Sequence, residues 1–169
     1  MQKIQLTQEQ VALVDDRDYG WLNQWKWCAM WDSKRSVFRA VRKRGGRLVL
    51  MSREICGLGK DDKQVGDHRN HDTLDNQRHN LRVCTQQQNT YNRKKGLHCN
   101  RKCSSVFVGV YWHKNNKRWV SRIKHNGTDI HIGSFDSEIE AAKARDIKAK
   151  ELFGDFACLN FPSPQEVSA

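Results

Sequence analysis

The sequence predicts an α+β protein made of two small domains, and three features of the chain support this prediction. Residues 106–162 contain three strand-like runs separated by turn residues, followed by one long helical pattern. Residues 61–96 show a pattern that predicts strand, polar loop, strand and helix. Residues 1–60 alternate short strand-like runs with charged residues and complete the first domain. A linker is expected at 97–105 and a tail at 163–169.

The composition indicates a polyanionic partner. The formal net charge is +11, and only 37% of the residues are hydrophobic. Such an excess of positive charge favours nucleic acid or an acidic membrane surface. No apolar run is long enough to span a bilayer, and the N-terminal "MQKIQLTQEQ" lacks the apolar core of a signal peptide. We therefore expect a cytoplasmic protein without an obligate protein partner, with its six cysteines as thiols rather than disulfides.

The first region contains three predicted strands, in "VALVDD", "SVFRAVRK" and "RLVLMSREI". Gly45 and Gly46 between the last two favour a two-residue hairpin turn. Aromatic residues cluster in "WLNQWKWCAMW", which contains Trp21, Trp25, Trp27 and Trp31. Aromatics at this density usually form a small core, and the alternative is a surface that stacks against bases.

The last region predicts a three-stranded antiparallel sheet packed on one helix. The strand candidates are "VFVGVYW", "RWVSRIKHNG" and "TDIHIGSF", with turns at 114–116 and at Asn126-Gly127. Ser137 and Glu140 have the spacing of a capping box, and Gly154 fits the helix end. The apolar face expected to lie on the sheet consists of Ile139, Ala142, Ala149, Leu152 and Phe153.

The middle region contains a dense polar cluster, "GDHRNHDTLDNQRHNLR". A short strand is expected around Leu81, and Thr85 and Gln88 form a second capping box that starts a helix near Gln86. This arrangement would bring Asp67 and His68 opposite Asn89 across a small sheet.

Together these groups can catalyse phosphodiester hydrolysis. The oxygens of Asp67 and Asn89 are hard ligands that suit Mg²⁺ or Mn²⁺. His68 titrates near neutrality and can take a proton from water, while Asn80 could orient its imidazole through a hydrogen bond. The metal would neutralise the scissile phosphate and the leaving oxygen.

A basic connector, "NRKKGLHCNRKCSS", follows this cluster and is expected to lie along a phosphate backbone. The alternative is a solvated linker. The cations assigned to DNA contact in and before the connector are Arg82, Arg93, Lys94, Lys95, Arg101 and Lys102. A structural zinc site is the weaker interpretation of Cys84, His98, Cys99 and Cys103, because their spacing is loose and no second ligand pair follows.

The motifs "DH" at 67–68, "DNQRHNLRVCT" at 75–85 and "QN" at 88–89 resemble the HNH endonuclease motif. The form is that of phage and intron homing endonucleases in which Asn replaces the last His. The resemblance implies a ββα-metal fold, with His68 as general base, Asp67 and Asn89 as metal ligands, and Asn80 as the residue that orients the base. "MSREICGL" also resembles a family segment, but Ser52 stands where His is usual, which we expect to affect packing or DNA contact.

The segments "VGVYWHKNNKRWVSRI", "IHIGSFDSEIEAAKARD" and "LFGDFACLNFP" resemble an AP2 DNA-binding domain. The resemblance implies that one face of the three-stranded sheet reads the major groove of DNA. The implied reading positions are Tyr111, His113, Arg118, Trp119, Arg122, Lys124 and His131. Trp119 could belong either to this face or to the core. Plant AP2 domains have Trp at the position of His131, so the resemblance implies DNA binding rather than a particular base preference.

These observations predict an HNH endonuclease of the homing type, encoded by a phage or intron, which cleaves double-stranded DNA with one Mg²⁺ or Mn²⁺. The first alternative is a non-catalytic, sequence-specific DNA-binding regulator with an inactive HNH fold. The presence of Asp67, His68, Asn80 and Asn89 argues against it. The second alternative is an RNA-binding module that uses the tryptophan-rich segment.

Overall fold

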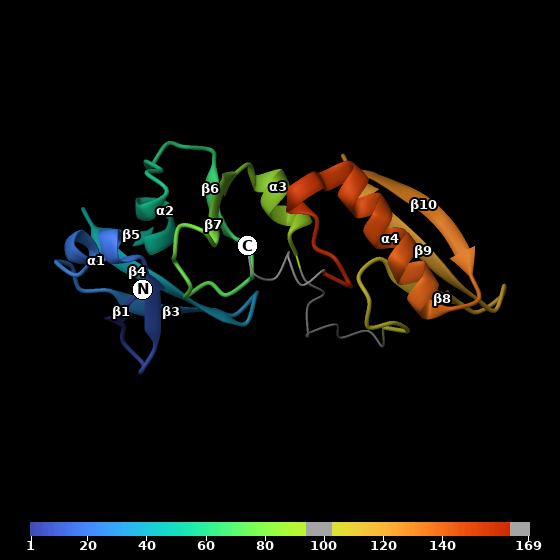
Figure 1. Ribbon diagram of the computed structural model, residues 1–169, viewed down its shortest axis with the longest axis horizontal. Helices are drawn as coiled ribbons and strands as arrows, with labels where there is room; N and C mark the ends of the chain where they lie inside the picture. The colour runs from blue at the N-terminus through green and yellow to red at the C-terminus, as the bar shows by residue number, and fades with distance from the viewer. Residues whose placement is uncertain (94–102, 163–169) are drawn as a thin grey trace. The chain divides into compact units, whose positions relative to one another are not determined.

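The computed structural model describes residues 1–93 and 103–162, and these form two compact units that divide between Asn89 and Thr90 (Figure 1). Both units contain small antiparallel sheets and helices, in agreement with the predicted α+β class. Within the described ranges, no helix is long and apolar enough to cross a membrane.

The first unit contains seven strands in three small sheets. The strands are β1 (Gln2–Gln5), β2 (Val11–Val14), β3 (Cys28–Asp32), β4 (Val37–Arg44), β5 (Arg47–Leu50), β6 (Val65–His68) and β7 (Leu81–Cys84). The helices are α1 (Asp16–Leu22), α2 (Met51–Ile55) and α3 (Gln86–Tyr91), of which α3 crosses the division between the units. Strands β1 and β2 form one hairpin, β3, β4 and β5 form a meander, and β6 pairs with β7.

The hairpin between β4 and β5 turns at Gly45 and Gly46, as predicted. Their φ angles are 55° and 76°, the left-handed values that a two-residue turn of this kind requires. The predicted strand "RLVLMSREI" is only partly correct, because β5 ends at Leu50 and its second half is helix α2. Met51 and Ile55 lie four residues apart on α2 and are both buried, so packing against the core favours the helix.

The tryptophan cluster does not form a core, contrary to the main expectation. Only Trp27 is buried, and its Nε1 donates a hydrogen bond to the carbonyl of Leu22 at 2.9 Å. Trp21 is 36% exposed, and Trp25 and Trp31 are each 50% exposed. The core is instead assembled from aliphatic residues of several elements: Ile4, Leu6, Ala12, Val14, Leu22, Ala29, Ala40, Met51, Ile55 and Leu81.

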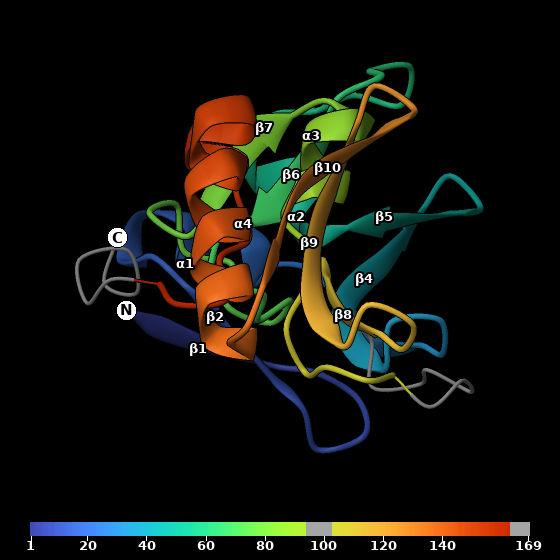
Figure 2. The same ribbon diagram turned by 90° about the vertical axis from the view of Figure 1, so that its right-hand side faces the viewer.

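The expected order of strand, loop, strand and helix is observed in β6, β7 and α3, which lie beside one another in Figures 1 and 2. The capping box at the start of α3 is also confirmed. The backbone amide of Thr85 donates to Oε1 of Gln88 at 2.9 Å, and the amide of Gln88 donates to Oγ1 of Thr85 at 3.2 Å.

The second unit is a three-stranded antiparallel sheet with one helix across one face (Figures 1 and 2). Its elements are β8 (Val110–His113), β9 (Arg118–His125), β10 (Thr128–Phe135), α4 (Glu138–Phe153) and a short 3-10 helix (Gly154–Phe156). The predicted Asn126-Gly127 turn joins β9 to β10, with φ angles of 49° and 82°. The first strand is shorter than expected, because "VFVG" lies outside it.

Helix α4 begins after Ser137 and ends at Gly154, as predicted. The expected capping bond from the Ser137 side chain is not made, and only its carbonyl accepts the amide of Ala141, at 3.1 Å. The buried face also differs from the expected one, since Ile139 is 51% exposed. The buried residues of the helix are Ala141, Ala142, Arg145, Asp146, Ala149 and Phe153.

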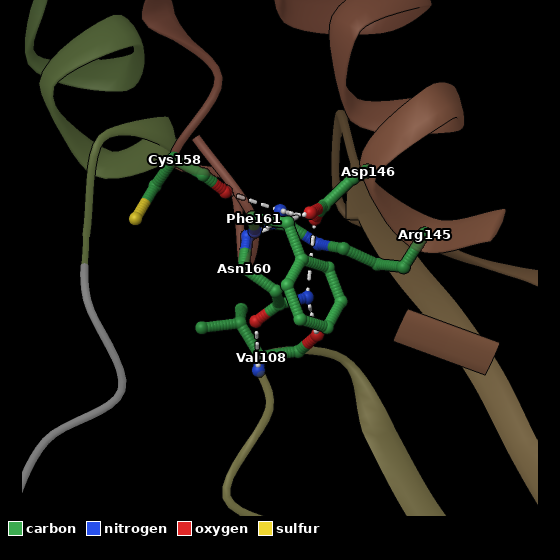
Figure 3. Close-up of polar contacts among 6 residues, drawn as sticks. All are labelled: Val108, Arg145, Asp146, Cys158, Asn160 and Phe161. Atoms are coloured by element: carbon green, nitrogen blue, oxygen red, sulfur yellow. Dashed lines mark hydrogen bonds and ion pairs between the residues drawn. The ribbon is translucent and has the colours of Figure 1, made fainter. Parts of the chain in front are cut away.

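Two charged residues occupy this buried face because they fasten the chain after the helix (Figure 3). Oδ2 of Asp146 accepts the backbone amide of Asn160 at 2.8 Å, and Arg145 donates to the carbonyl of Cys158. The Asn160 side chain in turn accepts the backbone amide of Val108 at 2.7 Å. Most of these buried polar groups are hydrogen-bonded, although Nε of Arg145 has no partner among the described residues. Their bonds fix the segment before β8 and the segment after α4 to the helix and to each other.

Among the described glycines of this unit, Gly109 leaves the least room for a side chain. Its φ angle is +77°, and a Cβ at this position would lie 2.5 Å from the carbonyl oxygen of Arg122. Gly127 has a similar φ of +82°, but a Cβ there would meet no atom within 4 Å. Substitution of either glycine by alanine incurs the free-energy cost of a positive φ angle, but only substitution of Gly109 adds a steric clash.

We predict that Gly109→Ala lowers the free energy of unfolding of the second unit by about 1–3 kcal/mol more than Gly127→Ala does. Hydrogen exchange of the β9 amides measures this difference within the unit. Equal losses in the two variants would contradict the proposed clash.

Candidate active site

The β6–β7 hairpin carries the acidic and imidazole groups of the site. Asp67 pairs with Arg82 across the ladder, and His68 pairs with Leu81. Asp67 is buried, and its carboxylate oxygen Oδ2 accepts Nε and Nη2 of Arg82 at 2.9 and 2.8 Å. Arg82 is itself buried with only 8% of its side chain exposed, so the structure does not support the expected DNA contact for this residue. It instead holds the Asp67 carboxylate in place.

His68 lies at the end of β6, where its Nε2 is 3.3 Å from the amide oxygen Oδ1 of Asn76. Burial lowers the pKa of His68 from the ordinary 6.5, and Asn76 and Asp67 partly oppose this effect by favouring the charged form. The imidazole is therefore mostly neutral near pH 7, which is the form that can accept a proton.

Asn76 contacts His68, and this contact was not predicted from the sequence. Its backbone amide donates to the carbonyl of Leu13 on β2 at 2.8 Å, while the amide of Leu13 donates to Leu74 at 2.9 Å. These two bonds hold the loop against β2 and keep Asn76 almost fully buried. No local sequence pattern marks this residue, because its position depends on a strand far away in the chain.

Asn80 acts on the loop rather than on the imidazole. Its Oδ1 accepts the backbone amide of Asn70 at 3.0 Å, and its Nδ2 donates to the carbonyl of Asp75 at 2.7 Å. Both side-chain groups thus bridge the two ends of the polar loop, and Asn80 is 2% exposed. The expected hydrogen bond from Asn80 to His68 is replaced by this indirect support.

A second set of polar contacts connects the loop to α1 and to the residue before it. Nε and Nη2 of Arg78 donate to the two carboxylate oxygens of Asp18, at 2.7 and 2.8 Å. The backbone amide of Arg78 also donates to Asp15 at 2.8 Å. The hydrogen bond from Arg78 lowers the pKa of Asp18, so the carboxylate stays charged under all but acidic conditions.

Asn89 lies on α3, and among the described residues its side-chain amide makes no hydrogen bond. The buried thiol of Cys84 connects this helix with the hairpin. Burial raises the pKa of Cys84 to about 11, the Asp67 charge adds to the shift, and a hydrogen bond from the Asn89 backbone opposes it. The Asn89 backbone thus contacts the thiol of a residue at the end of β7. A carboxylate and an amide oxygen are a suitable donor pair for Mg²⁺ or Mn²⁺.

The open face of the second sheet carries most of the predicted DNA-reading residues. On β9, Trp119 and Ile123 pack in clusters with residues of α4, so the alternate residues point to the opposite face. Cross-strand partners share a face. The predicted residues on the open face are Tyr111, His113, Arg118, Arg122, Lys124 and His131.

Trp119 does not lie on this open face. It packs against the cluster of Val110, Ala141 and Ala142, so its expected DNA contact is replaced by a core position. On the open face, the guanidinium of Arg122 lies 5.1 Å from the centre of the Tyr111 ring. This contact orients Arg122 along the sheet.

The connector lies largely outside the described residues, including Lys94, Lys95, Arg101, Lys102, His98 and Cys99. Arg93 is described and exposed. Cys103 is disulfide-bonded, contrary to the expectation that all the cysteines are thiols. The four cysteines at 28, 56, 84 and 158 are thiols. Within 1–93 and 103–162, no group of three or more His, Cys, Asp or Glu residues is placed to hold a metal ion.

We predict that Asn76→Asp raises the pKa of His68 by about 1–3 units, because it places a negative charge beside Nε2. The exposed Asn23 gives a matched control, since Asn23→Asp adds the same charge elsewhere in the unit. Titration of the His68 ring by NMR measures the shift. The contact with Asn76 would be disproved if both variants titrated like the unchanged protein.

The comparison with family models found no match. Among curated proteins, the chain is similar to an uncharacterized HNH endonuclease of Acanthamoeba polyphaga mimivirus, with 37% identity over 94 residues. The matched residues make up 56% of this chain and 46% of the viral protein, so the chain spans about half the length of the relative that it matches.

Proposed function

We propose that this protein is an HNH endonuclease of the homing type, which hydrolyses phosphodiester bonds in double-stranded DNA in a metal-dependent reaction. The observation that carries the proposal is the placement of His68, a neutral imidazole held by Asn76 beside the Asp67 carboxylate. The similarity to a viral HNH endonuclease supports the same reaction class. The net charge of +11 fits a polyanionic substrate.

In this proposal His68 is the general base. Its lowered pKa keeps the ring able to accept a proton from the attacking water at neutral pH. Asn76 fixes the ring through Nε2, and the β2 contact fixes Asn76. The ring is thus positioned before substrate binds, and this lowers the entropic cost of reaching the reactive geometry.

Asp67 and Asn89 would hold the metal ion, Mg²⁺ or Mn²⁺. Arg82 pairs with Asp67 through the carboxylate oxygen Oδ2. When bound, the ion would supply positive charge that stabilises the scissile phosphate and the leaving oxygen. Arg82 orients the carboxylate that would receive the ion.

The second unit would hold the DNA through an AP2-like sheet. Arg122 and Lys124 on its open face can neutralise phosphates or reach base edges in the major groove. Arg93 adds a cation before the connector. Phosphate contacts would provide most of the affinity and make it decrease with salt.

A regulator that binds without cutting is the second candidate, and the buried Asp67–Arg82 ion pair favours it. An arginine that neutralises the only acidic ligand reduces the attraction for a cation. The two candidates differ in one measurement. The unchanged protein nicks plasmid DNA with Mg²⁺ or Mn²⁺ if it is an enzyme, and binds without nicking if it is a regulator.

We predict that His68→Ala abolishes most plasmid nicking, because general base catalysis contributes about 100- to 10,000-fold to rates. Affinity for duplex DNA should be unchanged, since His68 is not expected to supply binding energy. His79 is exposed and serves as a matched control, so His79→Ala should nick normally. Undiminished nicking by His68→Ala would disprove the general-base role.

We predict that Lys124→Ala weakens duplex binding and reduces the slope of log affinity against log salt by about 1. Lys143 is an equally exposed lysine on α4, so Lys143→Ala should leave both quantities unchanged. Affinities at several salt concentrations, measured without divalent metal, test this difference. If Lys143→Ala had the larger effect, the helix side and not the sheet would face the DNA.

A further inference from the structure

The first unit contains an open groove of about 700 Å³ that the proposed hydrolytic site does not use. Two tryptophans line it, together with consecutive basic residues at the end of β4 and one acidic residue of α2. These residues are Trp21, Trp25, Arg42, Lys43, Arg44 and Glu54. An aromatic surface beside basic side chains is the combination that recognises unstacked bases joined by phosphates.

Trp25 contacts a buried arginine although it is half exposed. The guanidinium carbon of Arg42 lies 4.3 Å from the centre of the Trp25 ring. Arg42 is fixed in turn by an ion pair with Glu54, at 2.7 Å, in which both side chains are only 8% exposed. One face of the indole is therefore covered by a buried cation, while 50% of the residue stays accessible to solvent. Such an ordered aromatic ring loses little entropy when a flat group stacks on it.

The charge of the groove favours an anionic occupant. The only carboxylate in the lining belongs to Glu54, and its charge is compensated by Arg42 and approached by Arg44 at 3.8 Å. Lys43 and Arg44 are exposed, and Arg47 follows them across the turn. Lys43 and Arg44 line the groove together with Trp25, and Arg47 lies outside the lining. A nucleic acid fits this arrangement better than an acidic peptide does. Each of its nucleotides carries a flat base next to a charged phosphate, whereas the carboxylates of an acidic peptide are not regularly accompanied by flat rings.

We propose that this groove binds unpaired nucleotides of single-stranded DNA, with a base stacked on Trp25 and phosphates bound by Lys43 and Arg44. A duplex cannot use the indole in this way, because its base faces are already stacked on one another. The choice of DNA over RNA rests on the proposed function. The stacking itself is independent of hydrolysis and extends that function with a second nucleic-acid surface.

The test uses the full-length protein with EDTA at fixed salt, and it measures the affinity for fluorescein-labelled oligo(dT) by anisotropy. Trp25→Ala should weaken binding at least about five-fold, the factor that corresponds to about 1 kcal/mol for one stacked base. Trp31 is a matched control, since it is also 50% exposed but does not line the groove. Trp31→Ala should bind like the unchanged protein. Trp25→Phe retains a ring and should keep most of the affinity, and a loss in this variant would contradict the stacking even if Trp25→Ala failed to fold.

Three results would overturn the proposal. The first is an equal affinity for oligo(dT) in Trp25→Ala and Trp31→Ala. The second is an equal loss for a duplex of the same length, which would indicate a general electrostatic effect. The third is tighter binding of oligo(U) than of oligo(dT), which would assign the groove to RNA. Because EDTA prevents hydrolysis, these results are separate from plasmid nicking, which tests the proposed endonuclease.

Discussion

The contact between β2 and the loop before β7 is the constraint on which the candidate site depends. The loop is almost entirely polar and Leu74 is its one side chain that packs against the core, so hydrophobic burial contributes little to its shape. Two backbone hydrogen bonds with Leu13, one donated and one accepted by it, connect the loop to β2. The Arg78–Asp18 ion pair connects the loop to α1. Asn76 is carried into contact with His68 by this arrangement. The imidazole is therefore positioned by the fold of the whole first unit and not by its own strand alone.

The buried Asp67–Arg82 ion pair is energetically costly for a small domain. Removing two charges from water costs several kcal/mol per ion, and their attraction repays this only in good geometry. Here both guanidinium contacts are 2.8–2.9 Å. A hydrophobic pair of the same volume would often be at least as stable, so stability alone does not explain these residues. The proposed role of the Asp67 carboxylate as a metal ligand would explain them.

The features that the sequence predicted well are those decided by neighbours in the chain. The Gly45-Gly46 and Asn126-Gly127 turns and the capping box at Thr85 depend on a few adjacent residues. Burial depends instead on what the rest of the fold provides. The helix in "MSREI" and the exposure of Trp25 both result from contacts between distant elements, which no local period reveals.

The same distinction applies to the candidate site. The positions of Asp67, His68 and Asn89 on their strand and helix were predictable because the capping box and strand alternation fix them. The partners of these groups were not predictable. Asn80 and Asn76 are both loop amides, and only the pairing with β2 decides which of them reaches the imidazole.

Two arginines that look alike in the sequence differ in burial in the structure. Arg82 is buried against a carboxylate, whereas Arg122 is exposed on the open face of its sheet. Strand position decides between them. Arg82 lies opposite Asp67, while Arg122 lies between two residues that face α4 and so must point away from the helix. One residue of register shift in β9 would bury Arg122 and expose Ile123, which would cost both core packing and the binding surface. The stability of the second sheet and its proposed DNA-binding surface therefore depend on the same register.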